Sequence, residues 1–193
     1  MAKLYFKYGA MGSSKSAQAL ITKFNYEERN MKVWLIKPQT DTRNIGQVVS
    51  RIGLSATADI IPSCQSIADS FAKIKCNVII ADEAQFFTPK QIDELREIVN
   101  LYDIPVLCFG LRTDFLTHLF PGSQRLMEVA DSISEIKTIC SCGKKAIVNA
   151  RINQDGYVVT KGEQVYIGGN DSYVALCHRC WQNAIKHHIK VKE

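Results

Sequence analysis

Residues 9–16 read GAMGSSKS and directly follow a short apolar run. In a turn that leaves a strand and begins a helix, successive backbone N–H groups converge on an anion such as phosphate. Lys15 would then reach the β and γ phosphates of a nucleotide, and the Ser16 hydroxyl would bind Mg²⁺. The alternative is a serine-rich turn without a ligand. The predicted loop comprises Gly9, Ala10, Met11, Gly12, Ser13, Ser14, Lys15 and Ser16.

One position departs from the strict phosphate-loop pattern. Ser14 stands where the pattern has glycine, which is favoured there because the backbone must approach phosphate without a Cβ in the way. The serine either weakens ATP binding or is accommodated by the loop, and both alternatives stay open at this stage.

Two carboxylates follow the apolar run 78–81, which is typical of a fully buried strand. Ligands bind at the carboxyl ends of strands in open α/β sheets, where an aspartate organises Mg²⁺ and a second acid orients or deprotonates the nucleophile. The alternative is a pair of solvated acids, or acids favoured at a helix N-terminus. We include Asp82, Glu83, Ala84 and Gln85 in the predicted nucleotide site.

Four of the seven cysteines form two close pairs, and the other three are isolated. An odd total and the absence of a secretion leader argue against a disulfide framework. Four thiolates at this spacing predict one closed, tetrahedral and therefore structural Zn²⁺ site, and buried apolar filling is the alternative. The predicted ligands are Cys140, Cys142, Cys177 and Cys180.

Short apolar runs alternate with amphipathic ones, which predicts an α/β core with a central parallel sheet and crossover helices. The helix after residue 88 has Thr88 as N-cap, Pro89 at its first position and Gln91 completing a capping box. A long polar connection at 39–57 is of the kind that is functional or mobile. Strands are predicted at 4–8, 32–36, 60–61, 78–81, 105–111 and 133–138, and helices at 15–28, 66–74, 89–102 and 124–130.

The chain changes character after residue 138, with short strand-like pieces at 146–152 and 157–160 and a helix from about residue 179. We therefore expect a nucleotide-binding domain at 1–138 and a zinc-binding domain at 139–193. The second domain has few large apolar side chains, so we expect it to need a metal or partner contacts to stay folded.

The net charge of +5 lies at the C-terminal end, since residues 1–136 carry 15 basic and 15 acidic side chains and residues 137–193 carry 9 and 4. Such a surplus assists phosphate or nucleic-acid binding, or belongs to a solvated surface. No apolar run approaches the roughly 20 residues that span a bilayer. We expect a soluble, cytoplasmic protein that does not bind a membrane.

The order of these motifs resembles that of the type II, zinc-containing thymidine kinases over nearly the whole chain. The resemblance implies ATP- and Mg²⁺-dependent transfer of the γ-phosphoryl group to the 5′-hydroxyl of thymidine. It also implies that Glu83 is the general base and that Asp82 holds Mg²⁺. The matching segments are 9–16, Asp41-Thr42-Arg43, 82–86, 110–115, 137–140, and 167–170 with Tyr173 and Cys177.

The resemblance further implies a nucleoside wrapped by a loop tethered to the zinc site. Arg43 and Arg151 fall where the family has arginines near the phosphates, although surface salt bridges would explain either one. Asn149 falls near the thymine methyl, which leaves the preference for thymidine over deoxyuridine open. Ordinary core packing is the alternative for each aromatic side chain. The nucleoside contacts implied are Met11, Phe86, Leu111, Phe115, Phe120, Gly168 and Tyr173.

By resemblance the protein assembles as a homotetramer and is inhibited by thymidine triphosphate. A rival hypothesis is an ATPase that binds nucleic acid through its zinc-bearing segment; a structural zinc protein with a vestigial phosphate loop is a third. We expect no nucleic-acid partner, because four thiolates and Zn²⁺ add −2 to the C-terminal charge and no basic run with interleaved aromatics is present.

Overall fold

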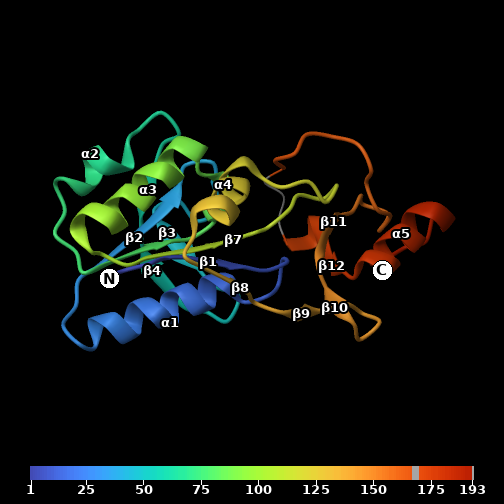
Figure 1. Cartoon of the computed structure of the whole chain (residues 1–193). Helices are drawn as coiled ribbons and strands as arrows, with labels where there is room; N and C mark the ends of the chain where they lie inside the picture. The colour runs from blue at the N-terminus through green and yellow to red at the C-terminus, as the bar shows by residue number, and fades with distance from the viewer. Residues whose placement is uncertain (167–169, 193) are drawn as a thin grey trace.

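A six-stranded parallel sheet forms the centre of the computed structural model, which describes residues 1–166 and 170–192 (Figure 1). The strand order is β5-β2-β6-β7-β1-β8, and every neighbouring pair runs parallel. This confirms the predicted α/β class. The strands are β1 (Leu4–Tyr8), β2 (Val33–Pro38), β5 (Asp59–Ile61), β6 (Val78–Ala81), β7 (Val106–Gly110) and β8 (Ser132–Glu135).

Helices cover both faces of the sheet. Successive strand residues point to opposite faces, so Val78 and Ile80 pack toward α1 (Lys15–Glu27), whereas Ile79 and Ala81 pack toward α3 (Pro89–Tyr102). The face that carries α3 also carries α2 (Ile67–Phe71) and α4 (Pro121–Val129), as Figure 1 shows. Strand β6 is apolar at every position because each face of the sheet is covered by its own apolar layer.

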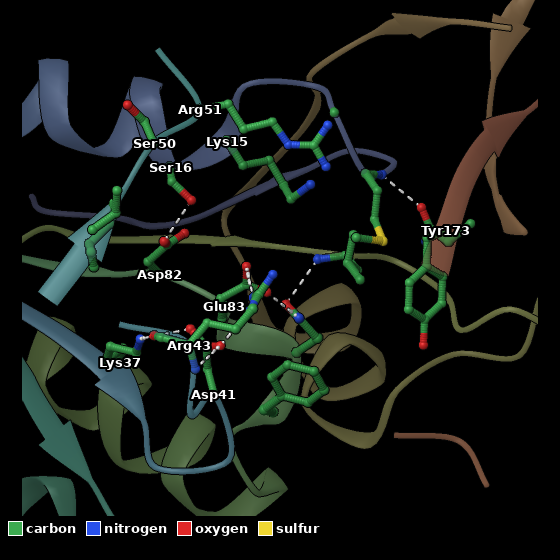
Figure 2. A pocket seen from close by; sticks show the side chains of 18 of the residues that line it. Lys15, Ser16, Lys37, Asp41, Arg43, Ser50, Arg51, Asp82, Glu83 and Tyr173 are labelled. Atoms are coloured by element: carbon green, nitrogen blue, oxygen red, sulfur yellow. Dashed lines mark hydrogen bonds and ion pairs between the residues drawn. The ribbon is translucent and has the colours of Figure 1, made fainter. Parts of the chain in front are cut away.

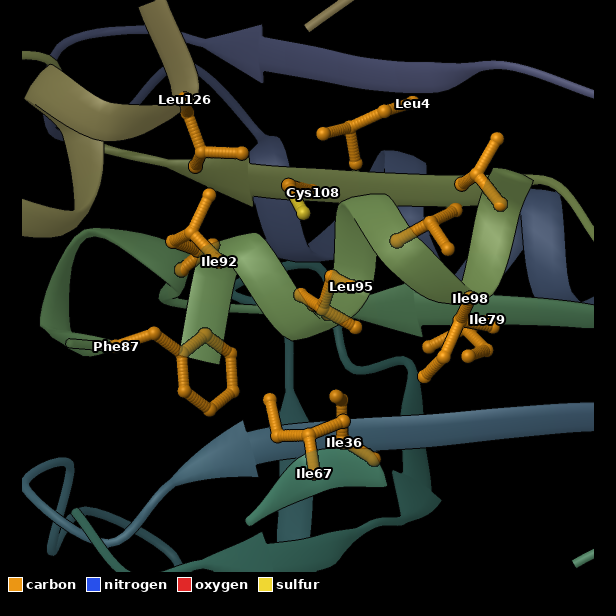
Figure 3. Close-up of a cluster of buried hydrophobic side chains, with 14 of the residues drawn as sticks. Leu4, Ile36, Ile67, Ile79, Phe87, Ile92, Leu95, Ile98, Cys108 and Leu126 are labelled. Carbon is orange, nitrogen blue, oxygen red and sulfur yellow. The ribbon is translucent and has the colours of Figure 1, made fainter. Parts of the chain in front are cut away.

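The larger apolar layer lies between α3 and the sheet (Figure 3). Ile92, Leu95 and Ile98 recur at helical spacing and reach the strand residues Ile79 and Cys108, and all five are at most 2% exposed. Each such aliphatic side chain contributes about 1.5–3 kcal/mol on burial. This layer fixes β6 and β7, and hence the loops that leave their carboxyl ends.

The start of α3 confirms the predicted capping box. The Thr88 hydroxyl accepts from the Gln91 N–H at 3.2 Å, and Gln91 Oε1 accepts from the Thr88 N–H at 3.0 Å. Helix α4 begins at Pro121, earlier than the predicted residue 124, and the proline ring suits a first helical position. Helix α5 (His178–His187) begins where it was predicted, after Cys177, whose sulfur accepts from the Cys180 N–H.

The polar connection at 39–57 contains a hairpin that the sequence did not indicate. It is formed by β3 (Gln47–Val49) and β4 (Ser55–Thr57), which pair antiparallel. Strands of three residues are too short to display a period of two. The strand predicted at 157–160 is wrong, because only an isolated bridge joins Val158 to Ile152.

The C-terminal part builds two small antiparallel pairs beside the main sheet (Figure 1). The strand predicted at 133–138 divides into β8 and β9, so the chain leaves the main sheet near residue 136. A small apolar cluster of its own surrounds Ala150 and Leu176. No helix within the described residues is long and apolar enough to cross a bilayer. The remaining elements are η1 (Ala84–Phe86), β9 (Thr138–Ile139), β10 (Lys145–Ala146), β11 (Val148–Arg151), η2 (Asn170–Ser172) and β12 (Tyr173–Leu176).

Candidate active site

A pocket opens at the carboxyl ends of the central strands (Figure 2). Its walls come from the loop 9–16, the β3–β4 hairpin, the residues after β6, the 111–120 connection and the segment 164–166. Segments more than 100 residues apart therefore meet at the edge where parallel α/β sheets place their ligands.

The loop 9–16 connects the end of β1 to the start of α1, as predicted for a strand-to-helix turn. Gly9 has no room for a side chain, since a Cβ there would lie 2.4 Å from the Ile136 carbonyl oxygen. Ser14 is the N-cap of α1 and has φ 62° and ψ 27°, the left-handed conformation that glycine adopts most easily. The serine is therefore accommodated by the backbone, in a conformation that costs an L-residue about 1–2 kcal/mol.

Lys15 is 8% exposed, and its ammonium group lies against the loop. It donates to the Ala10 carbonyl oxygen at 2.9 Å and to Ser13 Oγ at 3.4 Å. Burial lowers the pKa of Lys15 to about 8, although the charges of Glu83 and Asp82 oppose this effect. The two carboxylates therefore favour the charged ammonium despite its burial, and a phosphate contact requires that charge.

The Ser16 hydroxyl donates to Asp82 Oδ2 at 2.8 Å, which joins the start of α1 to the end of β6. The other oxygen, Asp82 Oδ1, is buried and has no hydrogen-bond partner among the described residues. Burial and the neighbouring Glu83 raise the pKa of Asp82 to about 7. A hydroxyl oxygen beside a carboxylate with an unpartnered oxygen is the hard-oxygen donor set that Mg²⁺ prefers.

Glu83 is held on both of its carboxylate oxygens. Arg43 Nη2 donates to Oε1 at 2.8 Å, and Gln85 Nε2 donates to Oε2 at 2.6 Å. The Gln85 side chain is itself oriented by the Leu111 N–H, which donates to its Oε1 at 2.9 Å. Glu83 has φ 51°, and a non-glycine residue with this backbone conformation is a common feature of functional sites.

Arg43 reaches Glu83 from a buried ion-pair network in the 39–57 connection. Its Nε donates to Asp41 Oδ1 at 2.7 Å, and Lys37 Nζ lies 2.7 Å from Asp41 Oδ2. The adjacent carboxylates of Glu83 and Asp41 raise the pKa of Arg43 despite its burial. Sequence reasoning missed Lys37, although a lysine at an otherwise apolar strand position is a usable signal.

Six of the seven residues expected to contact a nucleoside line the pocket. Phe86 and Phe120 pack edge to face with 5.5 Å between ring centroids, and Phe115 is buried. The remaining residue, Gly168, lies outside the described residues. The six are Met11, Phe86, Leu111, Phe115, Phe120 and Tyr173.

The structure adds Arg51 to the pocket and gives Asn149, expected near the thymine methyl, a second role as a buried bridge between loops. Arg51, on the β3–β4 hairpin, has Nη1 3.6 Å from where a Gly12 Cβ would be, and Figure 2 shows its guanidinium near Lys15. Asn149 is 2% exposed and accepts from the Met11 N–H while donating to the Thr113 carbonyl oxygen, each at 2.8 Å. Neither residue belongs to a local sequence motif. The neighbouring sequence therefore does not indicate that Asn149 joins two loops or that Arg51 lies near Lys15.

Arg151 lies in the C-terminal part and is not among the pocket-lining residues. Its donors reach the Tyr173 hydroxyl and the carbonyl oxygens of Glu163 and Gln164. Its predicted contact with phosphate stays a prediction.

The four predicted zinc ligands come together between β9–β10 and α5. Their sulfur atoms all lie within 4.8 Å of one another, and the Sγ atoms of Cys142 and Cys177 are 3.7 Å apart. Tetrahedral zinc with bonds of about 2.3 Å separates its sulfur ligands by about 3.8 Å. This donor set fits Zn²⁺.

Fold and site together define a P-loop α/β protein with a lysine-bearing loop between β1 and α1, two adjacent carboxylates after β6 and an aromatic pocket beside them. The thymidine kinase family model matches residues 2–181. The thymidine kinase of Yersinia pseudotuberculosis is 46% identical over 96% of this chain and 97% of its own, and that of Legionella pneumophila is 49% identical over 92% and 88%. The enzyme of phage T4 is 44% identical over 96% and 98%.

The chain belongs to the thymidine kinase family, and it is accordingly an ATP-dependent nucleoside kinase. Among solved structures, Bacteroides Pif1 bound to single-stranded DNA aligns with a TM-score of 0.38 at 14% identity, covering 69% of this chain and 38% of that one. That score is too low to relate the two folds.

Proposed function

We propose that this protein transfers the γ-phosphoryl group of ATP to the 5′-hydroxyl of thymidine and so produces thymidine monophosphate for DNA synthesis. The observation that carries the proposal is the position of Glu83. Its carboxylate is fixed by Arg43 and Gln85 in the same pocket as Lys15 and the aromatic wall. A base, a phosphate cradle and a place for a planar ring are the parts that the reaction needs.

Glu83 acts as the general base in this proposal. With both oxygens held, the carboxylate keeps one orientation and accepts the proton of the 5′-hydroxyl as that oxygen attacks phosphorus. Arg43 forms an ion pair with the carboxylate, and Gln85 links Glu83 to the 111–120 wall of the pocket through its hydrogen bond with the Leu111 N–H.

Lys15 binds the triphosphate together with N–H groups of the loop 9–16, other than those of Gly9, Met11 and Ser13, which donate within the fold. These donors stabilise the charge on the transferred group. Ser16 and Asp82 would hold Mg²⁺, which supplies charge neutralisation at the phosphates when bound. The residues proposed to bind ATP are therefore 9–16 together with Asp82, Glu83, Ala84 and Gln85.

The nucleoside site lies beside these groups. Met11, Phe86, Leu111, Phe115 and Phe120, with Tyr173, provide apolar and aromatic surface for the thymine ring. Zn²⁺ bound by the four cysteines would have a structural role, because all four positions of a tetrahedral ion are then filled by protein.

We further propose a homotetramer in the cytoplasm, where ATP is available and thiols stay reduced. The family relationship supports the assembly, as do large apolar side chains that α1 leaves outside the core. Ile21 and Phe24 are 47% and 58% exposed. Light scattering on the purified protein measures the mass directly, and a mass of one chain would refute the tetramer.

The test of the reaction is ADP release from Mg-ATP by zinc-loaded protein, alone and with thymidine, deoxyuridine, deoxycytidine or single-stranded DNA. We expect release that requires thymidine, with an equal amount of thymidine monophosphate. The ratio of kcat/KM for thymidine to kcat/KM for deoxyuridine measures how strongly the pocket near Asn149 favours the thymine methyl group. A hydrophobic contact with one methyl group is worth about 1–3 kcal/mol. Release stimulated by DNA and not by nucleosides would refute the proposal.

A further inference from the structure

Residues 163–166 form one wall of the pocket without belonging to a helix or strand. Gln164, Val165 and Tyr166 line the pocket, yet the Val165 and Tyr166 residues are 36% and 56% exposed. A segment that buries so little surface opens easily unless other contacts hold it.

Arg151, the last residue of β11, supplies such contacts and is itself 7% exposed. Its Nη1 donates to the Glu163 carbonyl oxygen at 3.0 Å and its Nη2 to that of Gln164 at 3.4 Å. Its Nε donates to the Tyr173 hydroxyl at 3.1 Å, which in turn donates to the Tyr166 carbonyl oxygen at 3.1 Å. One guanidinium therefore binds three residues of the segment, one of them through a hydroxyl.

Aromatic rings surround the same guanidinium. Its central carbon lies 3.9 Å from the ring centroid of Phe115, 5.1 Å from that of Tyr166 and 5.5 Å from that of Tyr173. Within residues 1–166 and 170–192, no carboxylate forms an ion pair with Arg151. Carbonyl dipoles and ring faces therefore offset its charge.

The segment has a second attachment on the side of the main sheet. Gln164 Nε2 donates to Asp114 Oδ2 at 2.9 Å, while Asp114 Oδ1 accepts from the N–H groups of Leu116 and His118. Arg151 and Asp114 thus hold the segment at two attachments, one to backbone carbonyl groups and one to the Gln164 side chain. Phe115, next to Asp114, lies under the guanidinium and joins the two attachments.

We propose that Arg151 is a positioning residue for the nucleoside site, holding residues 163–166 over the pocket, and that it does not bind phosphate. This inference rests on the proposed thymidine site. Only a planar group that stacks on a ring and donates in several directions makes these contacts together, so lysine is not equivalent to arginine here.

The kinetic test compares Arg151→Lys and Arg151→Gln with the wild type. We expect both variants to raise KM for thymidine by about tenfold or more, since each loses charged hydrogen bonds that hold the pocket wall. We expect KM for ATP to change by less than about twofold, because the phosphate cradle is untouched. A raised KM for ATP with an unchanged KM for thymidine would show that Arg151 binds phosphate and would overturn the proposal.

A second readout needs no catalytic activity. Lys161 is exposed and lies two residues before the held segment. A protease binds several residues on each side of the bond it cleaves, so trypsin cleavage after Lys161 becomes faster when the segment opens. Mass spectrometry of the wild type and variants should show this cleavage faster by about tenfold in both Arg151 variants. Cleavage at the wild-type rate would overturn the proposal. A wild type inactive on thymidine would refute the proposed function, while this readout would still test the positioning.

Arg125→Lys is the matched control, because this arginine is on the surface of α4 and pairs with Asp93 and Glu128 away from the pocket. We expect neither readout to change in it. Tyr173→Phe keeps the ring and removes only the hydroxyl between Arg151 and Tyr166, so it tests the same contacts should the Arg151 variants fail to fold. It should shift KM for thymidine and the cleavage rate in the same direction, and no shift in either would count against the proposal.

Discussion

Glu83 shows how one residue connects the backbone to the proposed chemistry. Its left-handed backbone conformation costs about 1–2 kcal/mol, and two hydrogen bonds, from Arg43 and Gln85, hold its side chain. The same contacts orient the carboxylate that the proposed reaction uses as a base. Strain and function therefore coincide at one residue.

Glu83→Gln should lower kcat by about 10²–10⁴, the usual contribution of a general base. The amide keeps the size of the side chain but cannot accept the proton of the hydroxyl. Binding of a non-hydrolysable ATP analogue, measured by calorimetry, should persist because Lys15 and Ser16 are unchanged. Glu128→Gln, on the exposed face of α4, is the control. A kcat within a few fold of the wild type would remove Glu83 from the role of base.

Ser14→Gly should raise the free energy of unfolding by between 0 and about 1.5 kcal/mol. Relief of the left-handed conformation gains about 1–2 kcal/mol, while the entropy of glycine costs about 0.5–1 kcal/mol. Ser14→Val should lose more than about 1 kcal/mol, because a β-branched residue fits this conformation poorly. Urea unfolding together with KM for ATP measures both variants. Equal stability of the glycine and valine variants would contradict the backbone explanation.

At the scale of elements, the conformation of the 39–57 connection, which follows β2, depends on the ion pair between Lys37 and Asp41. Lys37 and Asp41 are 2% and 7% exposed, and Lys37 also donates to the Arg43 carbonyl oxygen. Burial alone raises the pKa of the Asp41 carboxyl, but hydrogen bonds and charges from Lys37 and Arg43 outweigh burial and lower it below 3.8. The folded carboxyl therefore binds protons more weakly than the unfolded one. Its stabilisation is complete above about pH 5 and is lost as the pH falls through the folded pKa.

Asp41→Asn should lose about 3–5 kcal/mol of the free energy of unfolding at pH 7, because it leaves the buried Lys37 without a counter-charge. The difference from the wild type should shrink as the pH falls below about 4. Urea unfolding at several pH values measures both effects. Asp171→Asn, in the exposed pair with Lys192, should show no measurable change. A difference independent of pH would contradict the ion-pair explanation.

At the scale of the whole molecule, the sheet carries the phosphate cradle and the C-terminal part carries the cysteines. Cys142→Ser should abolish zinc retention, since serine is a poor ligand in a thiolate site. Thymidine phosphorylation should be lost with it, because Arg151 and Tyr173 lie on the strands beside the cysteines. Binding of an ATP analogue should remain, since Lys15, Ser16 and Asp82 belong to the main sheet and α1.

Metal content, phosphorylation rate and calorimetry measure these outcomes. Cys64→Ser is the control, because Cys64 is an exposed cysteine outside the cluster. Full zinc content in Cys142→Ser would refute the four-cysteine site. Loss of ATP binding together with zinc would refute the proposed division of the chain at residue 138.

The elements and motifs confined to neighbouring residues were predictable from the sequence. The run 78–81 with its two acids, the capping box at Thr88 and the glycine loop before Lys15 all depend on spacing within one turn or strand. Such local preferences act before distant parts of the chain meet. The cysteine pairs were predictable for the same reason, because ligand spacing is itself a local property.

Tertiary structure alone decided the contacts between distant residues. Arg43 meets Glu83 across 40 positions and Gln164 meets Asp114 across 50, while Arg151 turns toward aromatic rings and carbonyl oxygens. These pairings depend on which strands are neighbours in the sheet and on how the C-terminal part packs beside it. The type of a side chain determines which groups it can bind, and only long-range packing decides which of those groups lies next to it.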